Sequence, residues 1–203
     1  MFLNQFGPAS LLILVSNVAL GVVGLFFAPG LIQRCVFRPY EFARGIRRIT
    51  LVTHAFVHAD LPHLLFNMLT FFFFGPQLEG FIGTERFVLL YMLGLLVSPL
   101  SSYRKHRNDP GYATLGASGA ISAVLFAAIV YFPTSKLSLI LLPIPVPAPL
   151  FGVAYLAYSW WSARQNRGNI NHDAHFAGAL TGLVFVAITD PRAWVHAIHV
   201  VFG

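Results

Sequence analysis

Six long apolar segments without a charged side chain alternate along the chain with stretches that carry all of its charged residues. They cover residues 1–33, 61–78, 87–103, 110–135, 137–163 and 174–189. An α-helix rises about 1.5 Å per residue, so about 20 residues cross a bilayer core that is roughly 30 Å thick. The pattern therefore predicts six membrane-spanning helices, at residues 8–28, 62–80, 85–103, 116–132, 147–163 and 174–190.

The connections between these helices differ in length and character. Residues 29–60 form a long connection that carries five arginines: Arg34, Arg38, Arg44, Arg47 and Arg48. The sequence LLPIPVPAP at residues 141–149 contains four alternating prolines, which cannot continue a helix and favour extended backbone. We therefore expect a connector over residues 134–146 and a helix that begins near Pro147, because proline is tolerated in a first helical turn.

Both ends of the chain are apolar. The first segment lacks a basic region and has no A-x-A-like cleavage site before Pro29, so we expect a retained helix rather than a signal peptide. Residues 193–203 are too short to span a membrane, and we expect an interfacial tail or a fraying helix end there. No internal repeat or linker divides the sequence, which predicts a single domain over residues 1–203.

The composition supports a membrane protein. Hydrophobic residues make up 57% of the chain and charged residues only 10%, whereas a soluble domain carries about 25% charged residues. We therefore predict an all-α, polytopic protein of a lipid bilayer, and expect it in the cell (plasma) membrane. The net charge of +6 indicates loop charges near lipid headgroups rather than a nucleic-acid surface. The single cysteine, Cys35, excludes an internal disulfide.

Ser118 lies in the small-residue sequence GASGA, at the start of the fourth predicted helix. Small residues at this position leave the backbone accessible, which a nucleophilic serine would need. Taken alone, the same pattern is also typical of close packing between transmembrane helices. A hydrolase nucleophile elbow is disfavoured, because that motif requires a strand and a surrounding sheet.

A second polar group occurs in FVHADLPHLLFNM, at the start of the second predicted helix. His63 and Asn67 are four residues apart and share one helix face, while His58 precedes the helix. Asp60 followed by Pro62 is a helix start signal. Such side chains in a membrane indicate either a functional cavity or a hydrogen bond between helices. We expect no metal site, because the sequence has neither HExxH nor a nearby glutamate, and no cofactor.

The third group is NHDAHFAGALTG, at the start of the sixth predicted helix. Ala174, Gly178 and Gly182 recur every four residues and predict a smooth face for close helix packing, with His175 beside it. Asp173 is interpreted as a helix cap and His172 as an exposed loop residue.

These three groups together favour serine hydrolysis, which needs a nucleophile, a base and donors for an oxyanion. Because consecutive spans alternate in direction, the second, fourth and sixth helices begin on the same side of the membrane. Ser118, His175 and the pair His63 and Asn67 are therefore predicted to lie at a similar depth.

In the motifs HADLPHLLFNM, GASG and AHFAGALTG, and in their order, the sequence resembles the rhomboid intramembrane serine proteases. The resemblance implies a six-helix fold with a catalytic core over about 58–190, and a transmembrane protein as substrate. It implies a catalytic dyad of Ser118 and His175. It also implies an oxyanion hole formed by His63, Asn67 and the Ser118 N–H. His58 would shape a hydrated entry and Gly116 would give room near the nucleophile.

The sequence departs from this family pattern in two places. Ile49 and Thr50 stand where many members have Trp-Arg, and Ser122 stands where many carry an aromatic that packs on the catalytic histidine. The partner that orients His175 is therefore left open. The membrane orientation is open too, because the family topology would place ten basic residues outside and three inside, against the positive-inside rule. The alternative function is a non-catalytic rhomboid-like protein that binds or transports membrane clients.

Overall fold

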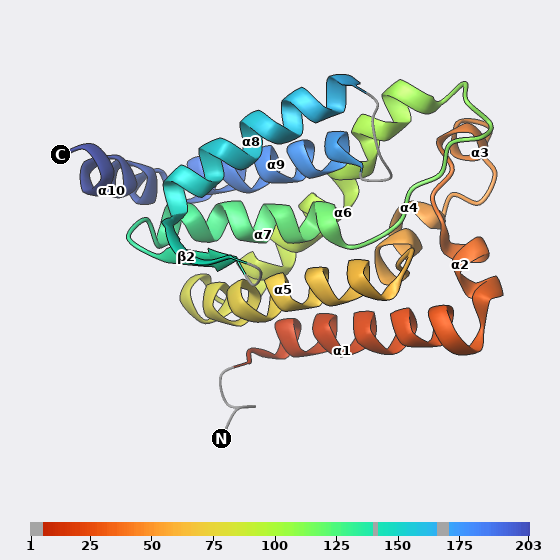
Figure 1. Ribbon diagram of the computed structural model, residues 1–203, viewed down its shortest axis with the longest axis horizontal. Coiled ribbons are helices and arrows are strands. Elements are labelled where there is room, and N and C mark those ends of the chain that lie inside the picture. The colour runs from red at the N-terminus through yellow and green to blue at the C-terminus, as the bar shows by residue number, and fades with distance from the viewer. Residues whose placement is uncertain (1–5, 140–141, 166–170) are drawn as a thin grey trace.

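The computed structural model describes residues 6–139, 142–165 and 171–203, and helices make up most of them (Figure 1). The six predicted helices correspond, with shifts of up to six residues at their ends, to α1 (Pro8–Val22), α5 (Leu61–Ile82), α6 (Thr84–His106), α7 (Ser118–Tyr131), α8 (Ala148–Gln165) and α9 (His172–Thr189). One turn of π-helix, η2 (Val23–Phe27), extends α1. Asp60 caps α5, since its Oδ1 accepts a hydrogen bond of 2.7 Å from the His63 N–H, which confirms the predicted start signal.

Fewer of the described helices are long and apolar enough to span a membrane than the six that the sequence predicts. Residues Pro8–Phe27 and Thr84–His106 qualify, and a third span results if α9 is combined with α10 (Pro191–Phe202) across a bend of 110°. One reason is length, because the 14 residues of α7 extend only about 21 Å. The chain is thus a helical, multi-pass membrane protein, while the count of six spans stays a prediction.

The connection over residues 29–60 is built from short helices: α2 (Pro29–Cys35), α3 (Pro39–Ala43), α4 (Thr50–Thr53) and the 3₁₀ turn η3 (His54–Phe56). Its middle is fixed to the segment before α7, since Phe37 and Thr114 exchange two backbone hydrogen bonds of 2.9 Å. The Phe37 side chain is fully buried. This connection therefore packs against the loop that leads to Ser118.

The predicted all-α fold is interrupted by a short pair of strands at the proline-rich connector. Strands β1 (Lys136–Leu139) and β2 (Leu142–Pro147) form an antiparallel pair there, with Lys136 opposite Pro147 and Leu137 opposite Val146. Alternating prolines place all of their missing N–H groups on one edge of a strand, so the other edge remains able to pair. The predicted extended backbone is therefore confirmed, but it is a hairpin, and α8 begins directly after it.

The C-terminal tail is a separate helix, α10, rather than a fraying end. Asp190 caps it by accepting a hydrogen bond from the Ala193 N–H, and Trp194 Nε1–H donates to the Leu183 carbonyl across the bend. Large apolar side chains, among them Val195, Ile198 and Phe202, are exposed along it. Its interfacial position stays a prediction.

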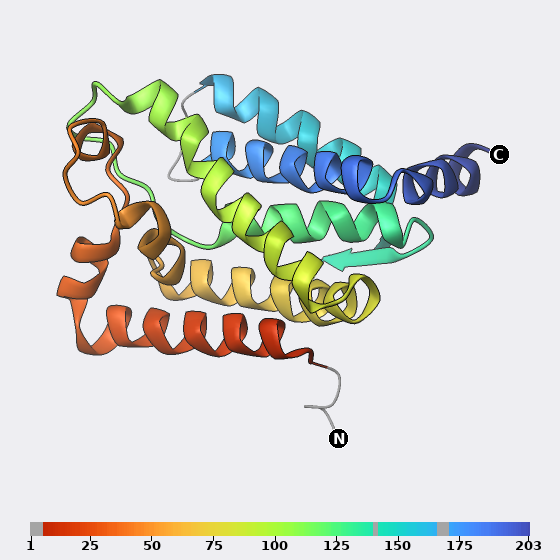
Figure 2. The same ribbon diagram turned by 180° about the vertical axis from the view of Figure 1, so that it is seen from behind.

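Helix α7 lies at the centre of the bundle, and α5, α6, α8 and α9 all contact it (Figures 1 and 2). Every residue from Gly119 to Tyr131 is buried. The surrounding helices expose large apolar side chains, such as Phe73, Val153 and Ile188. In water such exposure would be costly, whereas hydrocarbon makes it favourable. The distribution fits a bundle whose outer surface faces lipid.

Helices α5, α7 and α9 all begin at one end of the bundle, the end that also holds α2, α3 and α4 (Figure 1). Helices α1, α6 and α8 run in the opposite direction. The start of α1 lies at the far end, where the buried Glu79 carboxylate accepts hydrogen bonds from the Ala9 and Ser10 N–H groups and from the Thr84 hydroxyl. The three predicted polar groups therefore come to the same end of the molecule.

Glycines bring α9 into close contact with α7. A Cβ at Gly178 would overlap the Gly119 backbone, and one at Gly182 would overlap the Ala123 carbonyl oxygen. The predicted packing face of α9 is thus confirmed. It places the two backbones nearer to each other than any larger residue at these positions would permit.

We expect Gly178→Ala to force α9 away from α7, because the added Cβ meets backbone that cannot rotate aside. The free energy of unfolding should fall by about 1–3 kcal/mol, as in other overpacked cores. Thermal or SDS-induced unfolding of the purified protein in detergent measures this. Gly80→Ala is the matched control, since its Cβ has no neighbour within 4 Å, and it should leave stability unchanged or raise it. Equal stability of the two variants would contradict the close-packing explanation.

Candidate active site

Ser118 and His175 meet at the start of their two helices. Ser118 Oγ lies 2.7 Å from His175 Nε2, a short hydrogen bond between α7 and α9. When Nε2 carries no proton, the Ser118 hydroxyl donates to it. This is the arrangement in which an imidazole can accept the proton of a hydroxyl nucleophile.

Gly116 shapes the loop before Ser118. Its φ of +109° lies in the region that side chains rarely adopt, and its N–H donates a hydrogen bond of 2.9 Å to the His54 carbonyl. A Cβ on Gly116 would lie 2.8 Å from His63 Nε2 and 3.8 Å from Asn67 Nδ2. Both side chains therefore face this loop from α5, on the shared helix face that the sequence predicts. Any residue other than glycine would collide with His63.

Asn67 has an unused hydrogen-bond donor. The residue is buried, and its Nδ2 finds no hydrogen-bond partner in the part of the chain that the structure describes. An unpaired buried donor costs about 1–3 kcal/mol, so such groups are uncommon without a functional reason. An oxyanion formed beside Ser118 would provide the missing acceptor.

His58 lies behind His63. Its side chain is completely buried, neither ring nitrogen has a hydrogen-bond partner among the described residues, and its ring packs edge-on against His63 at 5.1 Å. The pKa of His58 is lowered to about 3, mainly by burial and to a smaller extent by the charge of His63, while Asp60 opposes the shift. His58 is thus neutral at ordinary pH. The described residues contain no group of three or more His, Cys, Asp or Glu placed to hold a metal ion.

The open question of what packs on His175 has an answer in α8. The Tyr155 ring lies nearly parallel to the His175 ring, at 15° and with 6.4 Å between centroids. The Tyr155 hydroxyl is 3.2 Å from Ser122 Oγ. Sequence reasoning missed Tyr155, because it lies 33 positions from Ser122 and only tertiary packing brings the two helices together. The serine at position 122 was the available signal.

The comparisons with known proteins decide the family. A family model described as Rhomboid domain matches residues 46–192, which is most of the chain. The chain belongs to the rhomboid family.

Several curated rhomboid relatives are similar to this chain. RHOMBOID-like protein 12, mitochondrial, from Arabidopsis thaliana is 30% identical over 66% of this chain and 44% of its own length. Rhomboid protein 1, mitochondrial, from Saccharomyces cerevisiae is 29% identical over 88% of this chain and 53% of its own length. The putative rhomboid protease YdcA from Bacillus subtilis is 39% identical over 35% of each chain. This chain thus spans about half the length of the first two relatives.

Two interpretations of the α9 start are wrong. His172 is buried rather than loop-exposed, because it begins α9 and packs edge-on against Tyr158 at 5.3 Å. Asp173 is not the cap, since Asn171 Oδ1 accepts the hydrogen bond of 3.1 Å from the Ala174 N–H. Asparagine is as good an N-cap as aspartate, and Asn171 occupies the non-helical position directly before the helix.

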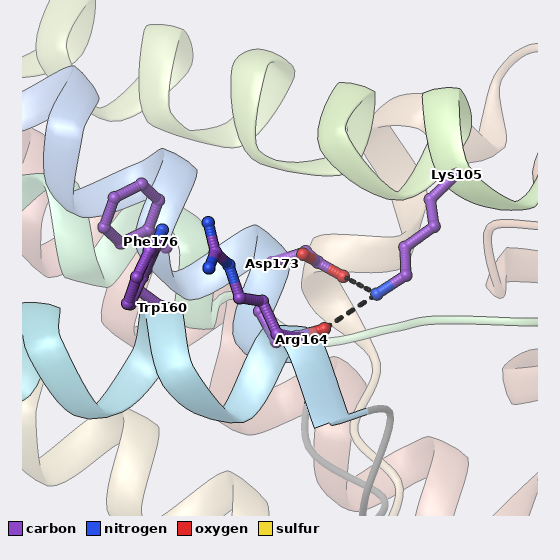
Figure 3. A pocket seen from close by; sticks show the side chains of 6 residues that line it. Lys105, Trp160, Arg164, Asp173 and Phe176 are labelled. Atoms are coloured by element: carbon purple, nitrogen blue, oxygen red, sulfur yellow. Dashed lines mark hydrogen bonds and ion pairs between the residues drawn. The ribbon is translucent and has the colours of Figure 1, made fainter.

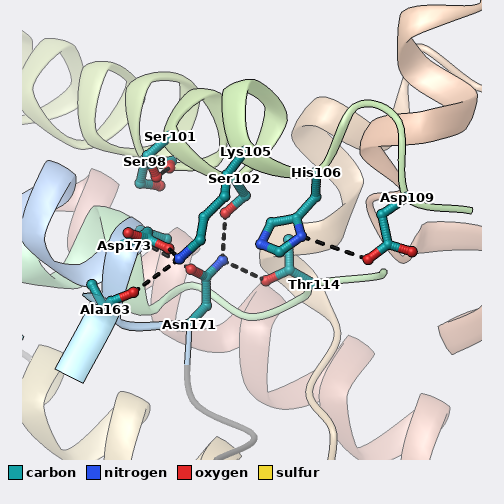
Figure 4. Close-up of polar contacts among 11 residues, drawn as sticks. Ser98, Ser101, Ser102, Lys105, His106, Asp109, Thr114, Ala163, Asn171 and Asp173 are labelled. Atoms are coloured by element: carbon teal, nitrogen blue, oxygen red, sulfur yellow. Dashed lines mark hydrogen bonds and ion pairs between the residues drawn. The ribbon is translucent and has the colours of Figure 1, made fainter. Parts of the chain in front are cut away.

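A polar cluster holds the α9 start in this rhomboid domain (Figure 4). Asn171 Nδ2 donates hydrogen bonds to the hydroxyls of Ser102 and Thr114, at 2.7 and 3.0 Å. Lys105 Nζ donates at 2.9 Å both to the Asp173 carboxylate and to the Ala163 carbonyl. The cluster therefore joins α6, α8, α9 and the loop before Ser118, and it fixes the helix that carries His175.

A pocket of about 450 Å³ lies beside this cluster, between α6, α8 and α9 (Figure 3). Its lining consists of Lys105, Trp160, Ala163, Arg164, Asp173 and Phe176. The Arg164 guanidinium lies 3.7 Å above the centre of the Trp160 ring. Neither Ser118 nor His175 lines the pocket, so it is separate from the candidate dyad.

The first departure from the family pattern falls in the connection before α5. Thr50 is buried in α4 and its hydroxyl donates a hydrogen bond of 2.7 Å to the Arg47 carbonyl, while Ile49 is exposed. The Arg47 side chain reaches Glu41 and the Gln33 carbonyl. Arg47 therefore stabilises this connection from within, without a tryptophan beside it.

Proposed function

We propose that this chain is an intramembrane serine endopeptidase that cleaves peptide bonds in or near the transmembrane segments of membrane proteins. The observation that carries the proposal is the 2.7 Å hydrogen bond between Ser118 and His175 in a rhomboid-family chain. A relative in Yersinia pestis is named a rhomboid protease and one in Bacillus subtilis a putative rhomboid protease, which supports the same activity here.

In the proposed reaction, Ser118 Oγ attacks the substrate carbonyl carbon while His175 Nε2 takes the hydroxyl proton. The oxyanion accepts hydrogen bonds from Asn67, His63 and the Ser118 N–H, and His175 then protonates the leaving amine. A water molecule, deprotonated by His175, hydrolyses the resulting acyl-enzyme and regenerates Ser118. The Asp173 carboxylate pairs with Lys105 instead of His175, which favours a dyad without an acidic third member.

The substrate must present an extended backbone, because a helix hides its carbonyl groups in internal hydrogen bonds. A transmembrane segment therefore has to unwind locally beside Ser118. The partners that follow are a lipid bilayer and a transmembrane protein substrate, with neither nucleic acid nor metal. The plasma-membrane location stays a prediction, since the relatives include proteins named mitochondrial and bacterial proteases.

The experiment treats purified protein in detergent or proteoliposomes with a fluorophosphonate probe and with a reporter that has one transmembrane segment. We expect a covalent adduct that mass spectrometry maps to Ser118, together with cleavage of the reporter. A non-catalytic client-binding protein, the alternative function, would bind the reporter without an adduct and without cleavage. That result would overturn the proposal.

A further inference from the structure

Two tyrosines of α8 face two histidines of α9. Tyr155 lies beside His175 with its ring nearly parallel to the imidazole, and Tyr158 packs edge-on against His172 at 5.3 Å. The two tyrosines are three residues apart in α8, and the two histidines are three residues apart in α9. The two helices run in opposite directions (Figure 1). The contacts are therefore successive steps of one antiparallel aromatic interface, in which Tyr155 occupies the step beside the candidate dyad.

The Tyr155 ring is held on several sides. Phe126 of α7 lies 5.5 Å from it and Phe151 of α8 lies 5.8 Å from it, measured between ring centroids. The Tyr155 hydroxyl is fixed by Ser122, one helical turn after Ser118. A ring restrained at its edges and at its hydroxyl can act as a rigid support for its neighbour.

Ser122 explains why the support comes from α8. Position 122 is buried in α7, and serine there is small enough to leave space for the tyrosine of the adjacent helix. Its hydroxyl also supplies the polar partner that a buried phenol requires. The pair Ser122 and Tyr155 thus combines a small polar residue on α7 with a large aromatic residue on α8.

We propose that Tyr155 is the positioning residue for His175, and that it makes the geometry of the dyad depend on the position of α8. The inference rests on the proposed function. The near-parallel ring limits rotation of the imidazole, so that Nε2 stays directed at Ser118 Oγ. Because Tyr155 belongs to α8, any movement of α8 away from α7 removes this support from His175. A shifted α8 therefore gives a less reactive dyad, and its return restores the dyad.

The test compares Tyr155→Leu, Tyr155→Phe and Ser122→Ala, with Tyr158→Leu as the matched control. Tyr155→Leu should lower kcat by about tenfold at unchanged KM. This factor corresponds to the free energy of one aromatic contact, lost from the stabilisation of the transition state. Tyr155→Phe keeps the ring and should retain most of the rate, while Ser122→Ala should fall between the two. Tyr158→Leu, which removes ring contacts to His172 and Trp161 but none to His175, should keep the wild-type kcat.

A second measurement does not depend on turnover. In protein with isotope-labelled histidine and the Ser118→Ala change, loss of the Tyr155 ring should shift the NMR signals of the His175 ring, and Tyr158→Leu should leave them in place. Unchanged His175 signals, or an unchanged kcat in Tyr155→Leu, would overturn the positioning role. Failure of the wild-type protein to be labelled at Ser118 would instead overturn the proposed protease function, so the two failures are distinguishable.

Discussion

Ser118→Ala should abolish cleavage of a transmembrane substrate, and His175→Ala should reduce it by a similar factor, roughly 10⁴-fold or more. The two side chains act as one unit across the 2.7 Å hydrogen bond, so after removal of either one the other can no longer contribute to catalysis. The double variant should therefore be no slower than either single variant. The measurement is the cleavage rate of a fluorogenic transmembrane substrate in proteoliposomes.

Ser101→Ala and His199→Ala are matched controls, because they remove the same chemical groups from positions outside the site. Ser101 donates to the Ser98 carbonyl within α6, and His199 is exposed on α10. Both should cleave at the wild-type rate. Losses that multiply in the double variant would show that Ser118 and His175 act independently, and the dyad assignment would be wrong.

The sequence predicts the helices well, because their signals are local. Charge-free segments locate the six long helices, and Asp60 with Pro62 marks the start of α5. The small residues that recur every four positions in α9 predict close packing against another helix, because close approach requires small residues, and the structure identifies that helix as α7. The β-hairpin is missed, because alternating prolines indicate extended backbone without indicating which edge will pair.

In the candidate site, too, the features with local signals could be predicted and those that depend on tertiary packing could not. Helix direction alone predicts that Ser118, His175 and Asn67 come to one end of the bundle, since α5, α7 and α9 begin there. The support of His175 by Tyr155 could not be predicted, because it depends on the rotation of α8 about its axis. The cap of α9 was assigned wrongly since Asn171 and Asp173 are both good capping residues, and the pairing of Asp173 with Lys105 is a long-range contact.

Asn67→Ala should lower kcat by about 10²–10³-fold, the cost of one oxyanion donor, or about 2.7–4 kcal/mol of transition-state stabilisation. The same change should cost little stability, because the Asn67 Nδ2 group makes no hydrogen bond among the described residues. Removal of an unpaired buried donor offsets the small cavity that alanine leaves. Activity and the free energy of unfolding should therefore respond very differently to this one substitution.

Asn17→Ala is the control that separates this effect from the loss of any buried amide. Asn17 is also buried and also has an unpaired polar atom among the described residues, its Oδ1, but it lies on α1 and its Nδ2 donates to the Ile13 carbonyl. Asn17→Ala should keep the wild-type kcat. If Asn67→Ala kept kcat as well, or lost activity only in proportion to lost folded protein, Asn67 would be a packing residue and the oxyanion would need other donors. Steady-state cleavage and unfolding curves of both variants distinguish these outcomes, because a donor that acts only in the transition state affects the rate and leaves folding intact.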